Sequence, residues 1–474
     1  MPGKLESSSE PENMATVPAP AVAPCFPLEE LAWKCTKNAI AVSQYLSTHD
    51  LPQPSHAPDG PSSTLPKNAP PSIQRARQSL MDAALQLFQL AAGPSEFIPN
   101  LAPGFQYVAC LRWLLHFNIF HLVPKSDTIS YGDLAASASK TAKAAIPIPE
   151  ARLKSILRMA ITAGLFNEPE PNRVSHSATS ALLARDADVH SWASYLSTRS
   201  APTALSMTAA HDRFTPASVA KNETAYNVAF GTELPFFDHL SQDPASMAEF
   251  AGYMRNVTTS EAVDVKHLVN GYPWAELGIG LVVDVGGSTG NAAIALARTF
   301  PDLRFIVQDL PDNANAGRTA AEGALPDHIL SRLTFQGHDF TNPQPVTDAD
   351  VYLLRMILHD WPDHVAIAIL KNLLPALESN KHAKLLIMDT VLPTPGQVPG
   401  SVERIVRVRD LTMMQVFNSH ERDLEQWTAL LRAADERLRL RRVIEPFGSA
   451  MSLLEVELDG EFPEEEEENW DISG

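Results

Sequence analysis

A histidine stands where an apolar run of the sequence gives way to charged residues. Residues 351–358 read VYLLRMIL, and His359, Asp360 and Trp361 follow directly before Pro362. Imidazole is the side chain that most readily takes or gives a proton near neutral pH. An isolated histidine in this position is more often a packed residue at the start of a helix. Proton-transfer chemistry at His359 is therefore favoured if other reactive groups share its place in the fold.

Charged residues recur where other apolar runs of this kind end. Five runs that predict buried strands each end in one charged side chain. The five are Asp284, Asp309, Asp339, Arg355 and Asp389. A single strand-end aspartate usually caps a turn or a helix. Ligands of open parallel sheets bind beyond the carboxyl ends of the strands, so five charges there favour a ligand site.

The first of these strands runs into a glycine-rich turn, DVGGSTG at residues 284–290. Glycines allow a tight turn and a close approach of the backbone to a ligand. A dinucleotide fingerprint would need glycine at the positions that hold Ser288 and Asn291. Asp309 ends the second strand 19 positions after Gly290, where a carboxylate can accept both hydroxyls of a ribose. The pattern indicates a nucleoside cofactor and favours S-adenosylmethionine over NAD.

Predicted strands and helices alternate over residues 281–458. This alternation implies a mostly parallel sheet with helices on both faces, which is an α/β Rossmann-like fold. The predicted strands are 280–284, 303–309, 333–339, 350–355, 384–389 and 451–458, and the helices include 290–300, 362–379 and 423–435.

The rest of the chain divides by composition and helical spacing. Three helices at 105–124, 130–142 and 149–166 and a hairpin at 167–177 have the order of a winged helix. The expected segments are a disordered N-terminus (1–24), helices with a Pro- and Ser-rich linker at 51–72 (25–98), the winged-helix-like domain (99–190), a helical substrate-pocket segment (191–280), the cofactor-binding catalytic domain (281–458) and an acidic tail (459–474).

The net charge of −19 limits the partners of the protein. Residues 455–474 hold ten acidic residues and no Lys or Arg, so the rest of the chain, with 37 basic and 46 acidic residues, has a charge of −9. An acidic body disfavours nucleic acid, because phosphate contacts supply most of that affinity. DNA binding through Arg152, Lys154 and Arg158 on the third helix of the small domain remains an alternative.

The cysteines and the hydropathy pattern concern the compartment. Cys25, Cys35 and Cys110 form no CxxC pair, which argues against a disulfide framework or a zinc site. No run of about 20 apolar residues could span a bilayer, and the N-terminus has no basic-then-apolar secretory pattern. We therefore expect a cytoplasmic protein that uses no metal.

Three stretches together resemble one enzyme family. LVVDVGGSTGNAAIALARTFPDLRFIVQDLP, GHDF and LLRMILHDWPD are similar to motifs of S-adenosylmethionine-dependent O-methyltransferases of the plant caffeate and flavonoid type. The resemblance covers about residues 75–458 and is strongest to fungal members that act on aromatic polyketides, the sterigmatocystin type. It implies that the winged-helix-like domain mediates homodimerisation and that the last strand is antiparallel. Ser288 and Arg355 depart from the pattern, since relatives commonly have glycine and lysine there.

The resemblance implies how the cofactor is bound. Gly286 would lie against the methionine end of S-adenosylmethionine, and Asp309 would hold the ribose. Asp339 and Phe340 match the pair beside the adenine, on which Trp361 would stack. Arg355 would complete the cofactor site.

The resemblance also implies a catalytic base, His359, with two acidic partners, Asp389 and Glu421. Asp389 is one methylene shorter than the glutamate of several relatives, so we expect a looser contact with His359. A phenol has a pKa near 10 and imidazole one near 6.5, so full proton transfer would cost about 5 kcal/mol. Carboxylates that stabilise imidazolium offset this cost. We interpret Asp360 mainly as a cap for the helix that Pro362 begins.

The substrate pocket is predicted from apolar residues in segments that flank the site in the family. Adaptable Met and aromatic side chains suit a flat aromatic ring. The candidates are Phe237, Met254, Met414 and Asn418, with Phe236, Met413 and Phe417 nearby. The resulting hypothesis is methylation of a phenolic hydroxyl on an aromatic polyketide in secondary-metabolite biosynthesis. The alternative is a catalytically silent relative that binds the cofactor and acts as a pathway scaffold or regulator.

Overall fold

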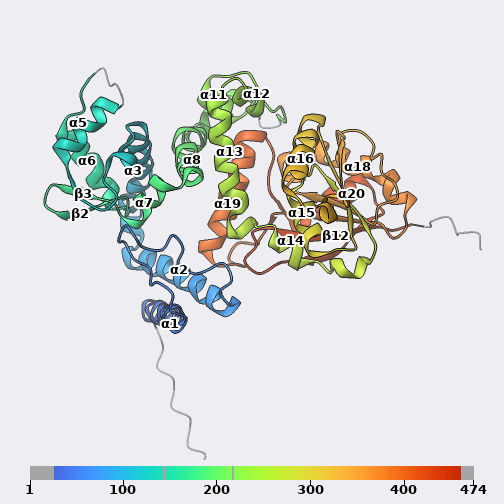
Figure 1. Cartoon of the computed structure of the whole chain (residues 1–474), viewed down its shortest axis with the longest axis horizontal. Coiled ribbons are helices and arrows are strands. Elements are labelled where there is room, and N and C mark those ends of the chain that lie inside the picture. Colours follow the sequence, from blue (N-terminus) through green and yellow to red (C-terminus); the bar gives the residue numbers. More distant parts are fainter. Residues whose placement is uncertain (1–25, 142–145, 216–217, 461–474) are drawn as a thin grey trace, which may run out of the picture.

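The computed structural model describes residues 26–141, 146–215 and 218–460 (Figure 1). The expected disordered N-terminus, Cys25 and most of the acidic tail lie outside these ranges. In the described ranges, no helix combines the length and the apolarity that crossing a bilayer requires.

A seven-stranded sheet forms the C-terminal half of the chain, with the strand order β11-β12-β8-β7-β4-β5-β6. Neighbouring strands among β8, β7, β4, β5 and β6 pair in parallel. Strand β12 pairs antiparallel with β8 on one side and with β11 on the other. The α/β fold class and the antiparallel last strand are confirmed. The strands are β4 (Leu281–Val285), β5 (Arg304–Asp309), β6 (Leu333–Gly337), β7 (Val351–Arg355), β8 (Lys384–Asp389), β11 (Leu438–Ile444) and β12 (Ser452–Leu458).

Both faces of the sheet are buried, which explains the continuous apolar runs. On β7, Tyr352 and Leu354 face one core with α18 and α20, while Val351 and Leu353 face a second core with α14 and α15. The helices of this part, seen on the right of Figure 1, are α14 (Lys266–Gly271), α15 (Asn291–Thr299), α16 (Pro311–Ala324), α17 (Asp327–Leu330), α18 (Asp363–Ser379) and α20 (Leu424–Ala434).

The N-terminal segment has a small core of its own. Helices α1 (Pro27–Thr48) and α2 (Pro71–Ala92) enclose a small core with Leu65 and Ala69 of the Pro- and Ser-rich segment between them. The carbonyl of His56 accepts a hydrogen bond of 3.1 Å from the N–H of Ala178. The predicted linker is therefore a docked connection in the structure.

A small helical module follows, and its core is continuous. Both predicted bounds of the helix at 105–124 are wrong, because α3 begins at Phe97 and ends at His116. Asn118 has a left-handed φ of 57°, which asparagine tolerates and which breaks the helix. The elements are η1 (Pro94–Glu96), α3 (Phe97–His116), α4 (Ile119–Leu122), β1 (Ile129–Ser130), α5 (Tyr131–Thr141), α6 (Glu150–Ile161), β2 (Asn167–Glu170), β3 (Arg173–Ser175) and α7 (Ala178–Arg185).

A helical layer lies between this module and the sheet (Figure 1). Helix α19 (Gly400–Phe417) belongs to the C-terminal half of the sequence but packs in this layer, against α9 and α11. The other elements of this layer are α8 (Ala187–Tyr195), the π-helical turn η2 (Leu196–Ser200), α9 (Ala201–Leu205), α10 (Met207–Arg213), α11 (Ala225–Phe230), α12 (Phe236–Ser241) and α13 (Pro244–Thr259). The turns η3 (Glu261–Val263) and η4 (Trp274–Leu277) pack into the second core of the sheet.

The stability of the sheet domain depends on α18, and one substitution tests this. Leu370 of α18 is fully buried in the core with α20, so Leu370→Ala should lower the free energy of unfolding by about 2–5 kcal/mol. Lys371→Ala on the exposed face is the control. Urea unfolding followed by circular dichroism measures both, and equal midpoints for the two variants would contradict this packing.

Candidate active site

A sharp turn after β7 delivers His359 to the carboxyl edge of the sheet. Met356, the first residue after the strand, has a left-handed φ of 55°, and its N–H donates to the carbonyl of Met388 at 3.0 Å. The 3₁₀ turn η5 (Leu358–Asp360) follows and places the imidazole inside the protein, with 7% of His359 exposed.

A two-residue parallel pairing brings Glu421 to the same place. Strand β9 (Val391–Leu392) continues from β8 and pairs with β10 (Arg422–Asp423), with Arg422 opposite Val391. Glu421 immediately precedes β10, and its own N–H donates to Asp410 of α19 at 3.1 Å. The two predicted acidic partners of His359 therefore come from neighbouring strand ends.

Three carboxylates surround the imidazole of His359. Its Nδ1 lies 3.0 Å from Oε1 of Glu421, within hydrogen-bonding distance, and 3.9 Å from Oδ1 of Asp389. Its Nε2 lies 3.6 Å from Oδ1 of Asp360. The Asp389 contact is the looser of the two on Nδ1, as its shorter side chain predicts. The structure thus brings together the three residues predicted as catalytic, and their roles stay a prediction.

The carboxylates control the protonation of this cluster. Burial disfavours imidazolium, but the negative charges of Asp360, Asp389 and Glu421 outweigh it and raise the pKa of His359 to about 10. Burial raises the pKa of Asp389 to about 7. Burial also opposes the charge of Glu421, yet the nearby His359 lowers the pKa of Glu421 below its usual value. His359 and Glu421 therefore form a buried ion pair.

Asp360 does not cap a helix, so this expectation is wrong. The N-cap position of α18 is Pro362, and no side chain accepts a hydrogen bond from the first turn. The intervening 3₁₀ turn rotates the Asp360 carboxylate toward His359 instead. Its burial raises the pKa of Asp360. Sequence reasoning missed this third carboxylate, although its adjacency to His359 was a signal.

Arg422 holds the turn that carries the histidine. Its position after Glu421 was the only indication of this role in the sequence. Its guanidinium is fully buried and donates to the carbonyls of Leu358 at 3.0 Å and Trp361 at 2.9 Å. It also binds the carboxylate of Asp363 at 2.7 Å. These bonds fix the backbone on both sides of His359.

The glycine turn and Asp309 meet at the neighbouring strands. The N–H of Ser288, at a left-handed φ of 51°, donates to Oδ2 of Asp309 at 2.8 Å. A Cβ on Gly286, whose φ is 74°, would lie 2.6 Å from Cδ1 of Ile357, so a side chain has no room there. The turn is thus tightly packed at Gly286, while Ser288 and Thr289 beside it are exposed.

The predicted adenine contacts form a small aromatic corner. Phe340 packs edge-to-face on Trp361, with ring centroids 5.8 Å apart, and reaches within 3.4 Å of the Cβ position of Gly286. Asp339 follows β6 by two residues rather than ending it. Its carboxylate accepts bonds from the N–H and hydroxyl of Thr341, which lower the pKa of Asp339.

Arg355 is turned into the protein. Its Nη2 donates to the carbonyl of Val263 at 2.6 Å, and its Nε is buried without a partner. Burial lowers the pKa of Arg355, and the nearby charge of Asp284 opposes that shift. Burial raises the pKa of Asp284 to about 6, and its Oδ2 is also buried without a hydrogen bond. These two unpaired polar atoms at the sheet edge suit a polar ligand.

Three of the predicted pocket residues are partly exposed apolar side chains, and the fourth, Asn418, holds a loop in place. Phe237 is half exposed and stacks on Phe417 with centroids 5.8 Å apart, and Met414 is 45% exposed. Met254 is partly buried on α13. Asn418 instead uses its amide Nδ2 to bind two carbonyls of the loop at residues 218–224. Across the described residues, no three His, Cys, Asp or Glu side chains form a set that could hold a metal ion.

Comparison with known proteins gives the class. The model of the O-methyltransferase domain matches residues 215–435. O-methyltransferase pgmB of Aspergillus terreus is 58% identical over 434 residues, which cover 91% of this chain and 96% of that protein. O-methyltransferase aurJ of Gibberella zeae is 47% identical over 435 residues, which cover 90% of this chain and 97% of that protein.

Solved structures share the fold at lower identity. The structure of OxaC with sinefungin and meleagrin is 23% identical, with a TM-score of 0.66 over 90% of this chain and 99% of that one. The mitomycin 7-O-methyltransferase MmcR is 21% identical, with a TM-score of 0.61 over 78% and 99%. The chain belongs to the O-methyltransferase family. It is an S-adenosylmethionine-dependent O-methyltransferase, as the sequence motifs predicted.

The ion pair in the site can be tested without turnover. Glu421→Gln keeps the shape of the side chain but removes the charge 3.0 Å from Nδ1, so the pKa of His359 should fall by about one unit or more. A proton NMR titration of the imidazole in the full-length protein measures this. Glu425→Gln, on the exposed face of α20, is the control, and an unchanged pKa in Glu421→Gln would contradict the pair.

Proposed function

We propose that the enzyme methylates a phenolic hydroxyl of an aromatic, polyketide-derived compound in secondary-metabolite biosynthesis, and that His359 is its general base. The observation that carries this proposal is the buried imidazole among three carboxylates at the ligand-binding edge of the sheet. S-adenosylmethionine supplies an activated methyl group and a positively charged sulfur when it is bound. We place the reaction in the cytoplasm and without a metal.

The proton chemistry of this cluster suits a phenol. With an ordinary pKa near 6.5, imidazole would take the proton of a phenol at a cost of about 5 kcal/mol. The surrounding carboxylates raise the pKa of His359 to about 10, near that of the phenol, so a neutral His359 would take the phenol proton at little cost. The same shift keeps His359 protonated in the free protein at neutral pH. His359 can therefore take the phenol proton only in the fraction of molecules in which its imidazole is neutral. This fraction grows as the pH rises.

The residues of the cofactor site fit a nucleoside sulfonium. Asp309 stands beside the glycine turn and accepts hydrogen bonds from Ser288, Leu310 and Asn313, which leaves one of its about four acceptor sites for a ribose hydroxyl. The aromatic corner of Phe340 and Trp361 offers surfaces for adenine. The backbone at Gly286 would contact the methionine end, with Asp339 and Arg355 at the borders of the site. Structures related in fold hold S-adenosylmethionine, sinefungin or S-adenosylhomocysteine.

An aromatic wall favours a flat substrate. Phe236, Phe237, Phe250 and Phe417 pack against one another with centroids 5.0–5.8 Å apart. Half-exposed Met414 lies on the helix that ends at Phe417, and Met254 lies on α13. Apolar surfaces of this kind bind rings with little specificity for substituents. We propose that this wall holds the ring while Asn418 fixes the adjoining loop.

Two alternatives are less well supported. One neighbour of this fold, 25% identical, is titled a pericyclic reaction enzyme, so the fold also serves other purposes. His359 with its carboxylates nevertheless favours methyl transfer over a silent scaffold. DNA binding through α6 is disfavoured, because Arg158 binds Glu168 at 2.6 Å and Lys154 donates to Asn172.

Removing the proposed base tests the function. His359→Ala should keep the fold and the affinity for S-adenosylmethionine but lower kcat by about 100-fold or more, because positioned acid–base catalysis contributes 10²–10⁴-fold. Calorimetry measures binding, and labelled methyl transfer to hydroxylated anthraquinones, xanthones and simple phenols measures turnover. His364→Ala, on the exposed face of α18, is the control. A kcat like that of the unmodified enzyme would refute the assignment.

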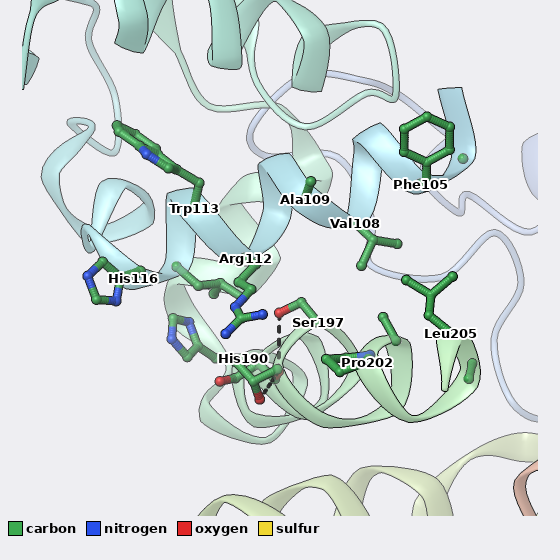
Figure 2. Close-up of a pocket in the computed structure, with 16 residues that line it drawn as sticks. Phe105, Val108, Ala109, Arg112, Trp113, His116, His190, Ser197, Pro202 and Leu205 are labelled. Atoms are coloured by element: carbon green, nitrogen blue, oxygen red, sulfur yellow. Dashed lines mark hydrogen bonds between the residues drawn. The ribbon is translucent and has the colours of Figure 1, made fainter. Parts of the chain in front are cut away.

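We also propose a homodimer built on the N-terminal helices. An apolar cavity of about 920 Å³ opens between α3 on one side and α8, η2 and α9 on the other. Figure 2 shows Val108 of α3 facing Leu205 of α9 across it, and Leu205 is 82% exposed. Leu101 and Phe105 of α3 are each about 60% exposed. Monomers rarely expose apolar surface of this extent.

Disrupting this surface should separate the subunits. Leu101→Glu with Phe105→Glu should shift the mass measured by light scattering after size exclusion from dimer to monomer, because buried unpaired carboxylates are strongly unfavourable. Ile279→Glu alters an even more exposed apolar residue next to β4 and should leave the mass unchanged. A monomeric unmodified protein at micromolar concentration would contradict the proposal.

A further inference from the structure

A short loop that carries Lys221 is fixed beside the proposed base. Nδ2 of Asn418, at the end of α19, donates to the carbonyls of Ala220 at 2.7 Å and Glu223 at 3.1 Å. Nδ2 of Asn222 donates to the carbonyl of Glu233 at 3.0 Å. Bonds on both sides of Lys221 therefore hold its backbone in place.

The ammonium of Lys221 lies directly on the indole of Trp361. Its Nζ is 3.3 Å from the ring centroid. A lysine can be held this way by the electron-rich face of tryptophan. Among the described residues, no carboxylate lies within ion-pair distance of this ammonium, and its partial burial lowers the pKa of Lys221. A half-buried cation without an ion-pair partner is unusual in a folded protein.

Asp360 links this cation to the catalytic cluster. Its carboxylate lies 3.6 Å from Nε2 of His359, and its charge also favours the protonated form of Lys221. The imidazole and the ammonium thus share one acidic neighbour on the same turn. Nε2 is the ring nitrogen of His359 that Glu421 leaves free, because Glu421 is bound to Nδ1. A hydroxyl that gives its proton to Nε2 would lie on the Asp360 side of the imidazole, on the turn that also carries Trp361, the indole on which Lys221 rests.

We propose that Lys221 determines substrate specificity by binding an anionic oxygen next to the hydroxyl that is methylated. This inference rests on the proposed function, since it assumes an aromatic hydroxyl at Nε2 of His359. The anionic oxygen is a carboxylate or an ionised second hydroxyl on the adjacent ring carbon. Trp361 positions the ammonium, and the charge of Asp360 favours its protonated form. The site thereby favours acidic phenols over neutral ones.

Matched naphthalene ligands test this in the full-length protein with S-adenosylhomocysteine bound. The first pair is 3-hydroxy-2-naphthoate and its methyl ester, and the second is 2,3-dihydroxynaphthalene and 3-methoxy-2-naphthol. Calorimetry should show tighter binding of the carboxylate than of its ester, or of the diol, whose second hydroxyl can ionise beside Lys221, than of its methyl ether, and the pair that responds identifies the kind of oxygen. Lys221→Met should weaken the binding of the favoured member by about 10-fold or more, because it removes a hydrogen bond to a charged group. It should weaken the binding of the capped partner by less than about 3-fold.

Two further variants separate charge from structure. Lys221→Arg should restore most of the preference, since it keeps the cation, whereas Lys381→Met at an exposed position should behave like the unmodified protein. Equal effects of Lys221→Met on both members of each pair, or no effect, would overturn the proposal. Failure of the unmodified protein to bind any of the four ligands would overturn it too. Selective binding without methyl transfer would support the role of Lys221 and refute the proposed function.

Discussion

The buried pair of His359 and Glu421 is the interaction on which the site depends. An imidazolium and a carboxylate 3.0 Å apart, both removed from water, are stable only when neighbouring groups hold them in place. Arg422 supplies that support from below the turn, through the carbonyls of Leu358 and Trp361. The hydroxyl of Ser419 adds a bond of 2.6 Å to the carbonyl of His359. The position of the cluster is thus fixed by hydrogen bonds to the backbone of the turn as well as by contacts between side chains.

Helix α19 connects this cluster to the substrate side. Asp410 in its last turns binds the N–H of Glu421, and Asn418 at its end binds the loop of Lys221. One helix therefore positions a carboxylate beside His359 and the loop that lies over the neighbouring indole. Phe417 at its end stacks on Phe237.

The sheet could be predicted from the sequence because its strands are buried on both faces and read as apolar runs. Strand β11 was missed, since LRLRRVI alternates apolar and basic residues and lies at the edge of the sheet. The end of α3 was missed because Asn118 breaks the helix by a backbone conformation that the apolar pattern does not reveal. Asp360 was misinterpreted because a single 3₁₀ turn decides whether its carboxylate faces a helix end or His359.

The sequence by itself determined the class of fold and the charged residues that gather at the carboxyl edge of its sheet. These follow from the order of apolar runs and from the residues at their ends. The tertiary structure decided the proton affinity of His359 and the neighbours of Lys221. Both depend on distances between segments far apart in the chain, such as residues 359 and 421, or 221 and 361. Electrostatic energies change steeply with separation and burial, and these are fixed only when the chain is folded.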